Sequence, residues 1–306
     1  IQHVDEFARV VDSLALRDNT DLYITGSNAR FLSGEIATML SGRYVEIRML
    51  PLSFKEYLDF VGDRTDLGRK YADYLQFGSF PYTVELGRNA VQIRGYLEGT
   101  YNTVILKDIM ARRGFSDIMT LESVLRFLFD NIGNLCSTKR ISDTLTTYGR
   151  KTSPHTVENY LASFKESFII YQAGRYDVKG KQYLKTLEKY YVVDIGLRNY
   201  LLGNKGTDVG HLLENVVYLE LIRRGYEVYV GKVGECEIDF VAVGADGLEY
   251  FQTSATVRDP MTLERELLPL QSVTDHYPKH LLTLDEDPPA EFNGIRRRNV
   301  LDFLLE

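Results

Sequence analysis

The sequence predicts a multidomain α/β protein, and three observations lead to that prediction. Short apolar runs rich in β-forming residues alternate with segments whose apolar residues recur every three or four positions. The chain has 306 residues, of which 44% are hydrophobic and 26% charged, so it has material for more than one core. The arrangement of these patterns changes along the chain, which indicates four successive units.

The first unit covers residues 1–60 and has a strand–helix pattern. A helix is expected over 4–17, followed by a short strand, Leu22 to Ile24, that ends at the polar tip Gly26-Ser27-Asn28. A second helix over 31–40 and a strand over 44–49 come next. The segment Pro51-Leu52-Ser53-Phe54 then caps a helix that runs to about residue 60. A strand that ends in a polar residue beside a helix start is typical of nucleotide-binding sheets. Residues 61–112 form the second unit, which is expected to be helical and lid-like.

The third unit covers residues 113–203 and combines helices with a hairpin. Two helices are expected over 121–129 and 137–148, and a third begins at Ser153-Pro154, where Ser suits the N-cap and Pro the first turn. Two β-rich runs, 168–171 and 189–194, flank a basic turn. Helices followed by a hairpin with a basic tip are the pattern of a winged helix-turn-helix.

The fourth unit covers residues 204–306 and is expected to form a sheet domain. A helix over 212–224 ends at Gly225, three strands follow between 227 and 254, and a helix is expected over 261–273. A helix, then strands, then another helix indicates an α/β or α+β domain.

Several long stretches resemble a known family. They are "LYITGSNARFLSGEIATMLSGRYVEIRMLPLSFKEYL", "GSFPY", "YLASFKESFIIYQAGRYDVKGKQYLKT", "KYYVVDIGLRNYLLG", "LLENVVYLEL" and "ECEIDFVA". The chain resembles AAA+-type P-loop ATPases that carry a C-terminal winged-helix and restriction-endonuclease-like (PD-(D/E)XK-like) region of unknown function. The resemblance implies the C-terminal part of an AAA+ core with a helical lid, followed by those two domains.

The same resemblance implies that the chain is a fragment. In the family, Ile-Gln follows the acidic end of the Walker B strand, and this chain begins with Ile1-Gln2. The sequence contains no G-x-x-x-x-G-K-[ST] motif. The intact protein is therefore expected to use ATP and Mg²⁺, whereas this fragment is expected to need no cofactor and to have no ATPase activity.

Two residues match catalytic positions of the family. Asn28 corresponds to sensor 1, an amide that orients the attacking water against the γ-phosphate; its alternative is a simple helix cap. Arg43 has the place of an arginine finger that reaches a neighbouring subunit's phosphate, which implies self-association through the ATPase core. The alternative for Arg43 is a surface ion pair with Glu35 or Glu46.

The winged-helix segment has a local excess of positive charge. Residues 137–189 contain ten basic and five acidic residues, although the whole chain has a net charge of −7. Arg150 and Lys151 at a helix start and Lys179 and Lys181 at the hairpin tip are expected to contact the phosphates of double-stranded DNA. The alternatives are a solvated face or a non-catalytic interaction module that binds a protein partner.

The last domain is expected to contain a damaged nuclease-like site. An active enzyme of that fold needs a helix Glu, a strand Asp and a Glu-x-Lys, so that the acids hold Mg²⁺. Glu214 and Asp239 fit the first two positions, but Gln252 and Ser254 replace the Glu and the Lys. We therefore expect no nuclease activity, and Glu214 and Asp239 fit structural hydrogen bonding at least as well as metal binding.

The remaining features exclude other classes. No apolar run is long enough to span a bilayer, and the first residues do not form a signal peptide. Cys136 and Cys236 match no metal or redox spacing, and the five histidines show no metal-ligand spacing. The sequence thus predicts a cytoplasmic protein without a metal site or a membrane partner.

Overall fold

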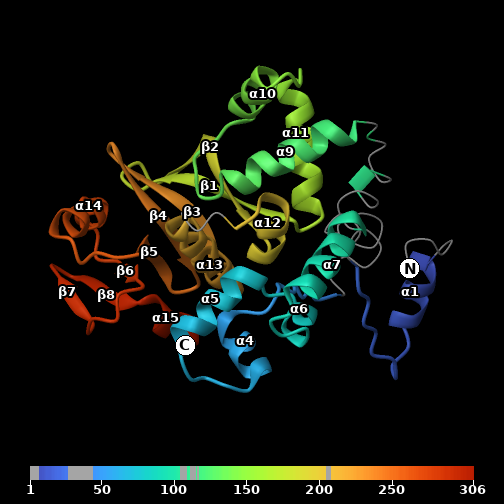
Figure 1. Ribbon diagram of the computed structural model, residues 1–306, viewed down its shortest axis with the longest axis horizontal. Coiled ribbons are helices and arrows are strands. Elements are labelled where there is room, and N and C mark those ends of the chain that lie inside the picture. Colours follow the sequence, from blue (N-terminus) through green and yellow to red (C-terminus); the bar gives the residue numbers. More distant parts are fainter. Residues whose placement is uncertain (1–6, 27–43, 104–108, 111–114, 116, 205–207) are drawn as a thin grey trace.

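A computed structural model describes residues 7–26, 44–103, 109–110, 115, 117–204 and 208–306. Its named elements are a series of helices, followed after residue 169 by the strands of one large sheet with further helices between them (Figure 1). The helices are α1 (Phe7–Ala15), α4 (Phe54–Val61), α5 (Leu67–Phe77), α6 (Pro81–Glu85), α7 (Ala90–Thr100), α9 (Ile118–Asp130), α10 (Thr138–Thr147), α11 (Pro154–Glu166), α12 (Ile195–Leu202), α13 (Val209–Arg223), α14 (Pro260–Gln271) and α15 (Val300–Leu305). The strands are β1 (Ile170–Asp177), β2 (Gln182–Val192), β3 (Glu227–Val233), β4 (Cys236–Gly244), β5 (Gly247–Ser254), β6 (Lys279–Thr283), β7 (Ala290–Phe292) and β8 (Ile295–Asn299).

The eight strands form one mixed sheet in the order β2-β1-β3-β4-β5-β6-β8-β7. Hairpin pairs β1–β2, β3–β4 and β4–β5 are antiparallel, whereas β1 pairs with β3, β5 with β6, and β6 with β8 in parallel. The pairing of β1 with β3 joins the hairpin of the predicted third unit to the sheet of the predicted fourth unit. The sheet therefore crosses the proposed boundary at residue 203, although the domain limits themselves stay a prediction.

Helices α13 and α14 cover opposite faces of this sheet. Phe240, Phe251 and Leu282 pack in one core cluster with residues of α13. Their chain neighbours Val241 and Tyr250 pack in another cluster with residues of α14. Because successive side chains of a strand point to opposite faces, the two helices lie on different sides. This arrangement decides which polar residues of the sheet meet each other.

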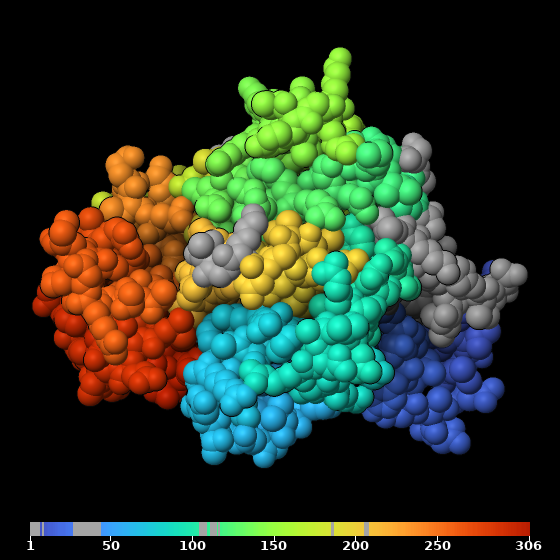
Figure 2. Space-filling model, viewed as in Figure 1, coloured from blue at the N-terminus to red at the C-terminus, as the bar shows by residue number. Residues whose placement is uncertain are grey.

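Helices α9 to α12 pack together beside the sheet and contribute to a third core cluster with the base of the β1–β2 hairpin. Segment 118–166 stands at one end of the molecule in the space-filling view (Figure 2). Between α9 and α10, the backbone of Cys136 forms an isolated antiparallel β-bridge with Glu188 of β2. The expected order of three helices followed by a hairpin is therefore present, and the observed strands β1 and β2 are longer than the two predicted β-rich runs.

Two predicted strands of the first unit are absent from the described residues. Residues 20–26 and 44–50 have no strand assignment, and Val45, Ile47 and Met49 are 87%, 74% and 88% exposed. A strand needs a hydrogen-bonded neighbour, and neither segment has one among the described residues. Helix α1 lies apart from the sheet (Figure 1). The sequence prediction of these strands was wrong for this chain.

A buried carboxylate ties the segment after α5 to α12. Asp194 is the N-cap of α12, where its Oδ1 accepts from the Leu197 amide at 2.8 Å. Its Oδ2 accepts from the amide and the hydroxyl of Ser79, at 2.6 and 2.9 Å. Gly78 precedes with φ of 85°, and a Cβ there would lie 2.5 Å from this carboxylate. Only glycine fits, which explains the Gly-Ser of "GSFPY" in physical terms.

Candidate functional site

Four charged side chains from three elements meet on the α13 side of the sheet, and we call them the Lys189 cluster: Lys189, Glu214, Glu237 and Asp239. Lys189 Nζ lies 2.8 Å from Glu214 Oε1, 2.8 Å from Glu237 Oε1 and 3.8 Å from Asp239 Oδ1. Lys189 comes from β2, Glu214 from α13, and both other acids from β4. Three of the four residues are buried, and Glu237 is half-buried.

Further polar groups surround the buried carboxylates of the cluster. The Tyr191 hydroxyl donates to Glu214 Oε1 at 2.7 Å, and His211 Nδ1 lies 3.9 Å from Glu214 Oε2. Asp239 Oδ2 accepts from both the amide and the hydroxyl of Thr253, each at 2.8 Å. Buried carboxylates need such partners, so the arrangement satisfies the acids without a bound ion.

The charges of the cluster shift one another's pKa. Burial by itself would lower the pKa of Lys189, but Glu214, Asp239 and Glu237 raise it above its ordinary value. Burial likewise opposes ionisation of Glu214, but Lys189 and the hydrogen bonds of His211 and Tyr191 lower its pKa. Burial and the charge of Glu214 raise the pKa of Asp239 to about 7. At neutral pH Lys189 and Glu214 are therefore both charged.

The structure does not bring together the four residues expected for a nuclease-like site. Glu214 and Asp239 meet at Lys189, whereas the Gln252 side chain accepts from the Asp239 backbone amide at 3.2 Å and donates to Glu266 on α14 at 2.9 Å. Ser254 Oγ donates to the carbonyl of Thr256 at 3.0 Å. Among the residues that the structure describes, no three or more His, Cys, Asp or Glu side chains are placed to hold a metal ion. The side chains that do meet are suited to pairing with a cation of the chain.

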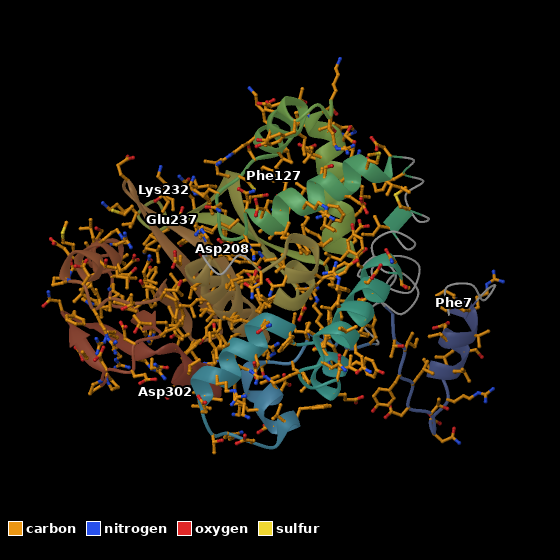
Figure 3. The ribbon with its side chains drawn as sticks, viewed as in Figure 1. Phe7, Phe127, Asp208, Lys232, Glu237 and Asp302 are labelled. Atoms are coloured by element: carbon orange, nitrogen blue, oxygen red, sulfur yellow. The ribbon has the colours of Figure 1, made fainter. Side chains whose placement is uncertain are left out.

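Sequence reasoning missed Lys189 and Glu237 as members of this cluster. Lys189 was counted with the basic excess of the hairpin, but it is 3% exposed and does not contribute to a surface charge. Glu237 pairs with Lys232 of β3 in the β3–β4 register, and the two lie close together in Figure 3. The sequence signal for Glu237 was its alternation with Ile238 and Asp239 in the strand. No local pattern indicated Lys189, because its place in the cluster depends on the pairing of β1 with β3.

The residues expected at a DNA interface lie at exposed or half-exposed positions. Lys151, Lys179 and Lys181 are exposed, and Arg150 is half-buried. At the hairpin tip, Asp177 Oδ1 accepts from the amides of Lys179 and Gly180, at 3.1 and 3.0 Å. This turn leaves both lysine side chains at the surface, where they are accessible to a phosphate backbone.

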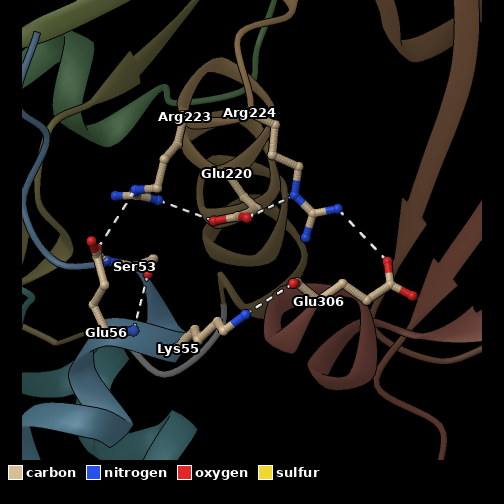
Figure 4. A pocket seen from close by; sticks show the side chains of 7 residues that line it. All are labelled: Ser53, Lys55, Glu56, Glu220, Arg223, Arg224 and Glu306. Carbon is tan, nitrogen blue, oxygen red and sulfur yellow. Dashed lines mark hydrogen bonds and ion pairs between the residues drawn. The ribbon is translucent and has the colours of Figure 1, made fainter. Parts of the chain in front are cut away.

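A pocket of about 420 Å³ lies where α4, the end of α13 and the end of α15 meet (Figure 4). Glu220 accepts from Arg223 at 3.1 Å and from Arg224 at 2.8 Å. Arg223 also donates to the carbonyl of Pro51 at 2.6 Å and lies 3.8 Å from Glu56. We call Glu220, Arg223 and Arg224 the Glu220 network. Because these charges pair with one another, the residues that line the pocket are suited to holding α4, α13 and α15 together.

Asn28 and Arg43 lie outside the described residues, so their expected catalytic roles stay predictions. No helix in the described part of the chain has both the length and the apolar character needed to cross a membrane.

Comparison with known proteins defines the class first. Residues 1–58 match the model of an AAA domain, and residues 68–208 match a domain of unknown function (DUF8612). The chain thus joins an AAA-like region to a domain whose role is not defined. The AAA match ends inside α4, beside the Glu220 network.

The relatives then define the family. An uncharacterized protein of Haemophilus influenzae is 42% identical over 309 residues, which is all of this chain and 76% of the relative. This chain belongs to the same family as that protein. The uncharacterized protein MJ1544 of Methanocaldococcus jannaschii is 29% identical over 80% of this chain, which spans 57% of that relative's length. No solved structure matches the chain.

Proposed function

We propose that this chain is part of an AAA-type ATPase that couples ATP hydrolysis to recognition of double-stranded DNA. The observation that carries the proposal is that one chain combines an AAA match at 1–58 with a helix–hairpin unit, α9 to β2, that has exposed lysines. Lys179 and Lys181 at the hairpin tip and Arg150 and Lys151 before α11 are the DNA-contacting residues. Lysine and arginine at such positions neutralise phosphates and release counterions.

In the ATPase part, Asn28 positions the attacking water and Arg43 acts on a phosphate of a neighbouring subunit. ATP and Mg²⁺ are the cofactors of the intact protein. Val45, Ile47 and Met49 are exposed and alternate with Glu46 and Arg48, and such a row of exposed apolar side chains supports contact of this segment with a further protein surface. Self-association through the ATPase core follows from the role of Arg43.

The nuclease-like region has a recognition role in this proposal and does not cleave DNA. Gln252 is engaged with Glu266, and the Lys189 ammonium lies between Glu214 and Glu237. A hydrolytic metal needs open carboxylate ligands and a free position for water. We expect no cleavage of a plasmid in Mg²⁺ or Mn²⁺.

The test is the salt dependence of duplex binding. A labelled duplex of about 25 base pairs is titrated with the chain between roughly 50 and 200 mM salt, and the slope of log K against log[salt] is measured. We expect a steep negative slope, and Lys179→Ala/Lys181→Ala is expected to reduce its magnitude by about 2.

The matched control is Arg64→Ala/Arg69→Ala, which removes two exposed cations near the start of α5, outside both regions proposed to recognise DNA. It is expected to leave the slope unchanged. Absent binding, or an affinity that salt does not alter, would reject DNA recognition. A protein partner captured in a fixed ratio, with no nucleic acid, would then favour an interaction module.

A further inference from the structure

We propose that Lys189 is a built-in counter-ion whose ammonium permanently fills the position between Glu214, Glu237 and Asp239, and that it thereby fixes the β1–β2 hairpin on the sheet. Lys189 acts as a positioning residue for the hairpin and has no direct contact with a ligand. The proposal concerns a side chain that the DNA-binding surface does not use.

The contacts show that the ammonium is the centre of the cluster. The two shortest ion pairs of Lys189 are of equal length, 2.8 Å, and lead to two different elements, α13 and β4. The Lys189 side chain is 4% exposed, and those of Glu214 and Asp239 are 8% and 12% exposed. At this burial a carboxylate without a cation is strongly disfavoured, because solvent does not replace the lost partner. One cation therefore compensates acids from both neighbouring elements.

The position of Lys189 in the hairpin gives this pairing a structural consequence. In the β1–β2 register, Ala173 pairs with Lys189 but Arg175 pairs with Leu184, so β2 has a large bulge before Lys189. Within the bulge, Leu187 has a φ of +64°, a strained conformation for a leucine. Lys189 is the residue at which the ladder resumes. Its ion pairs hold the strand where strand pairing itself is interrupted.

Beyond the bulge, the outer part of the hairpin reaches the tip at Lys179 and Lys181. This outer part is connected to the rest of the sheet by the parallel pairing of residues 175–177 with β3. Loss of the anchor at Lys189 leaves that short pairing, the Cys136–Glu188 bridge and the apolar contacts of Val178 to define the position of the tip. The inference about the tip rests on the proposed function, whereas the inference about the counter-ion does not.

The first experiment is chemical rescue. Lys189→Ala leaves a space and two buried carboxylates, and we expect its melting temperature to fall by roughly 10 °C. Ethylammonium chloride is expected to restore several degrees in a saturable way, because a small primary ammonium can replace the missing group. Sodium chloride and tetramethylammonium chloride at the same ionic strength are expected to restore none. Lys181→Ala changes an exposed lysine in the turn just before β2 and is the control. It is expected to change the melting temperature by about 1 °C or less.

A second variant keeps the test decisive if Lys189→Ala does not fold. Lys189→Met/Glu214→Gln removes one charge of each sign, and we expect it to be more stable than Lys189→Met alone.

In the unsubstituted chain, Mg²⁺ and Mn²⁺ are expected to give no saturable increase in melting temperature. Such an increase, abolished by Glu214→Gln, would overturn the proposal, because a metal would then hold the site. Equal stability of Lys189→Met and the double variant, or an absence of amine rescue in a folded Lys189→Ala, would also overturn it.

A final measurement addresses the hairpin tip. We expect the duplex affinity of Lys189→Ala to fall about tenfold and to recover with ethylammonium, although Lys189 is buried. If the unsubstituted chain does not bind DNA, the proposed function fails but the melting experiments still decide the role of Lys189. If duplex affinity is the same in Lys189→Ala as in the unsubstituted chain, the positioning of the tip by Lys189 is wrong.

Discussion

The two ends of α13 hold acids in different surroundings. Near its start, Glu214 faces Lys189, whose side chain is 4% exposed. At its end, Glu220 faces Arg223 and Arg224, whose side chains are 23% and 25% exposed. Both acids are themselves buried and both have pairing distances near 3 Å. The cations differ in their access to water.

This difference shows that the distance between two charges does not by itself determine how much their ion pair contributes to stability. Where the cation is buried, removal of one partner leaves a charge that solvent does not stabilise. Where the cation reaches water, solvent and salt replace part of the interaction. The Lys189 cluster is therefore expected to respond strongly to substitution and pH, and the Glu220 network to respond weakly and to depend on salt.

The largest expected effect is on the pH dependence of stability at the Lys189 cluster. Because the pKa of Asp239 is raised to about 7 in the folded chain, the folded state binds its proton more tightly than the unfolded state. Its contribution to stability is therefore lost as the pH rises from about 4 to about 7. In Asp239→Asn this pH dependence is absent, so between about pH 5 and pH 8 the unfolding free energy of the variant should rise relative to the original chain by about 3 kcal/mol. Urea unfolding at both pH values measures this difference, and parallel pH curves would contradict it.

The next effect compares the two acids directly. Glu214→Gln keeps the shape of the side chain but removes one of the two closest charges from Lys189. We expect a loss of about 2 kcal/mol in the free energy of unfolding, nearly independent of salt between roughly 0.1 and 1 M. Urea unfolding at several salt concentrations provides the measurement. A loss that disappears at high salt would show that solvent reaches the cluster.

The smallest effect is expected at the other end of the helix. Glu220→Gln leaves Arg223 bonded to the Pro51 carbonyl and Arg224 bonded to the Phe303 carbonyl. We expect a loss of about 1 kcal/mol at low salt, shrinking as the ionic strength increases. The same urea experiments test it. A loss equal to that of Glu214→Gln would break the comparison between the two ends.

Much of the fold follows from local patterns in the sequence. The helices α9, α10, α11, α13 and α14 and the strands β3, β4 and β5 lie close to their predicted positions, because apolar periodicity and capping residues such as Ser53 and Ser153 act over a few residues. Helices α12 and α15 and strands β6 to β8 were not predicted. They are short, and their packing partners lie far away in sequence.

The candidate site was predicted only in part, for a topological reason. Glu214 and Asp239 were singled out from local motifs and do meet at one cation. The source of that cation, Lys189, depends on where β1 and β2 join the sheet, which no short motif encodes. Gln252 was placed with the acids because of its spacing, but its strand turns it toward α14. Residue spacing thus identified the acids and missed their partner.

The parallel pairing of β1 with β3 also has a consequence for folding. Residues 175–177 and 230–232 are brought together across more than fifty intervening residues, which include α12 and α13. Closing such a loop is entropically costly, and the pairing becomes favourable only when the core around α13 has formed. We therefore expect the hairpin and the C-terminal strands to unfold together, and a chain that ends between them to leave the β1 edge open to pairing with other molecules.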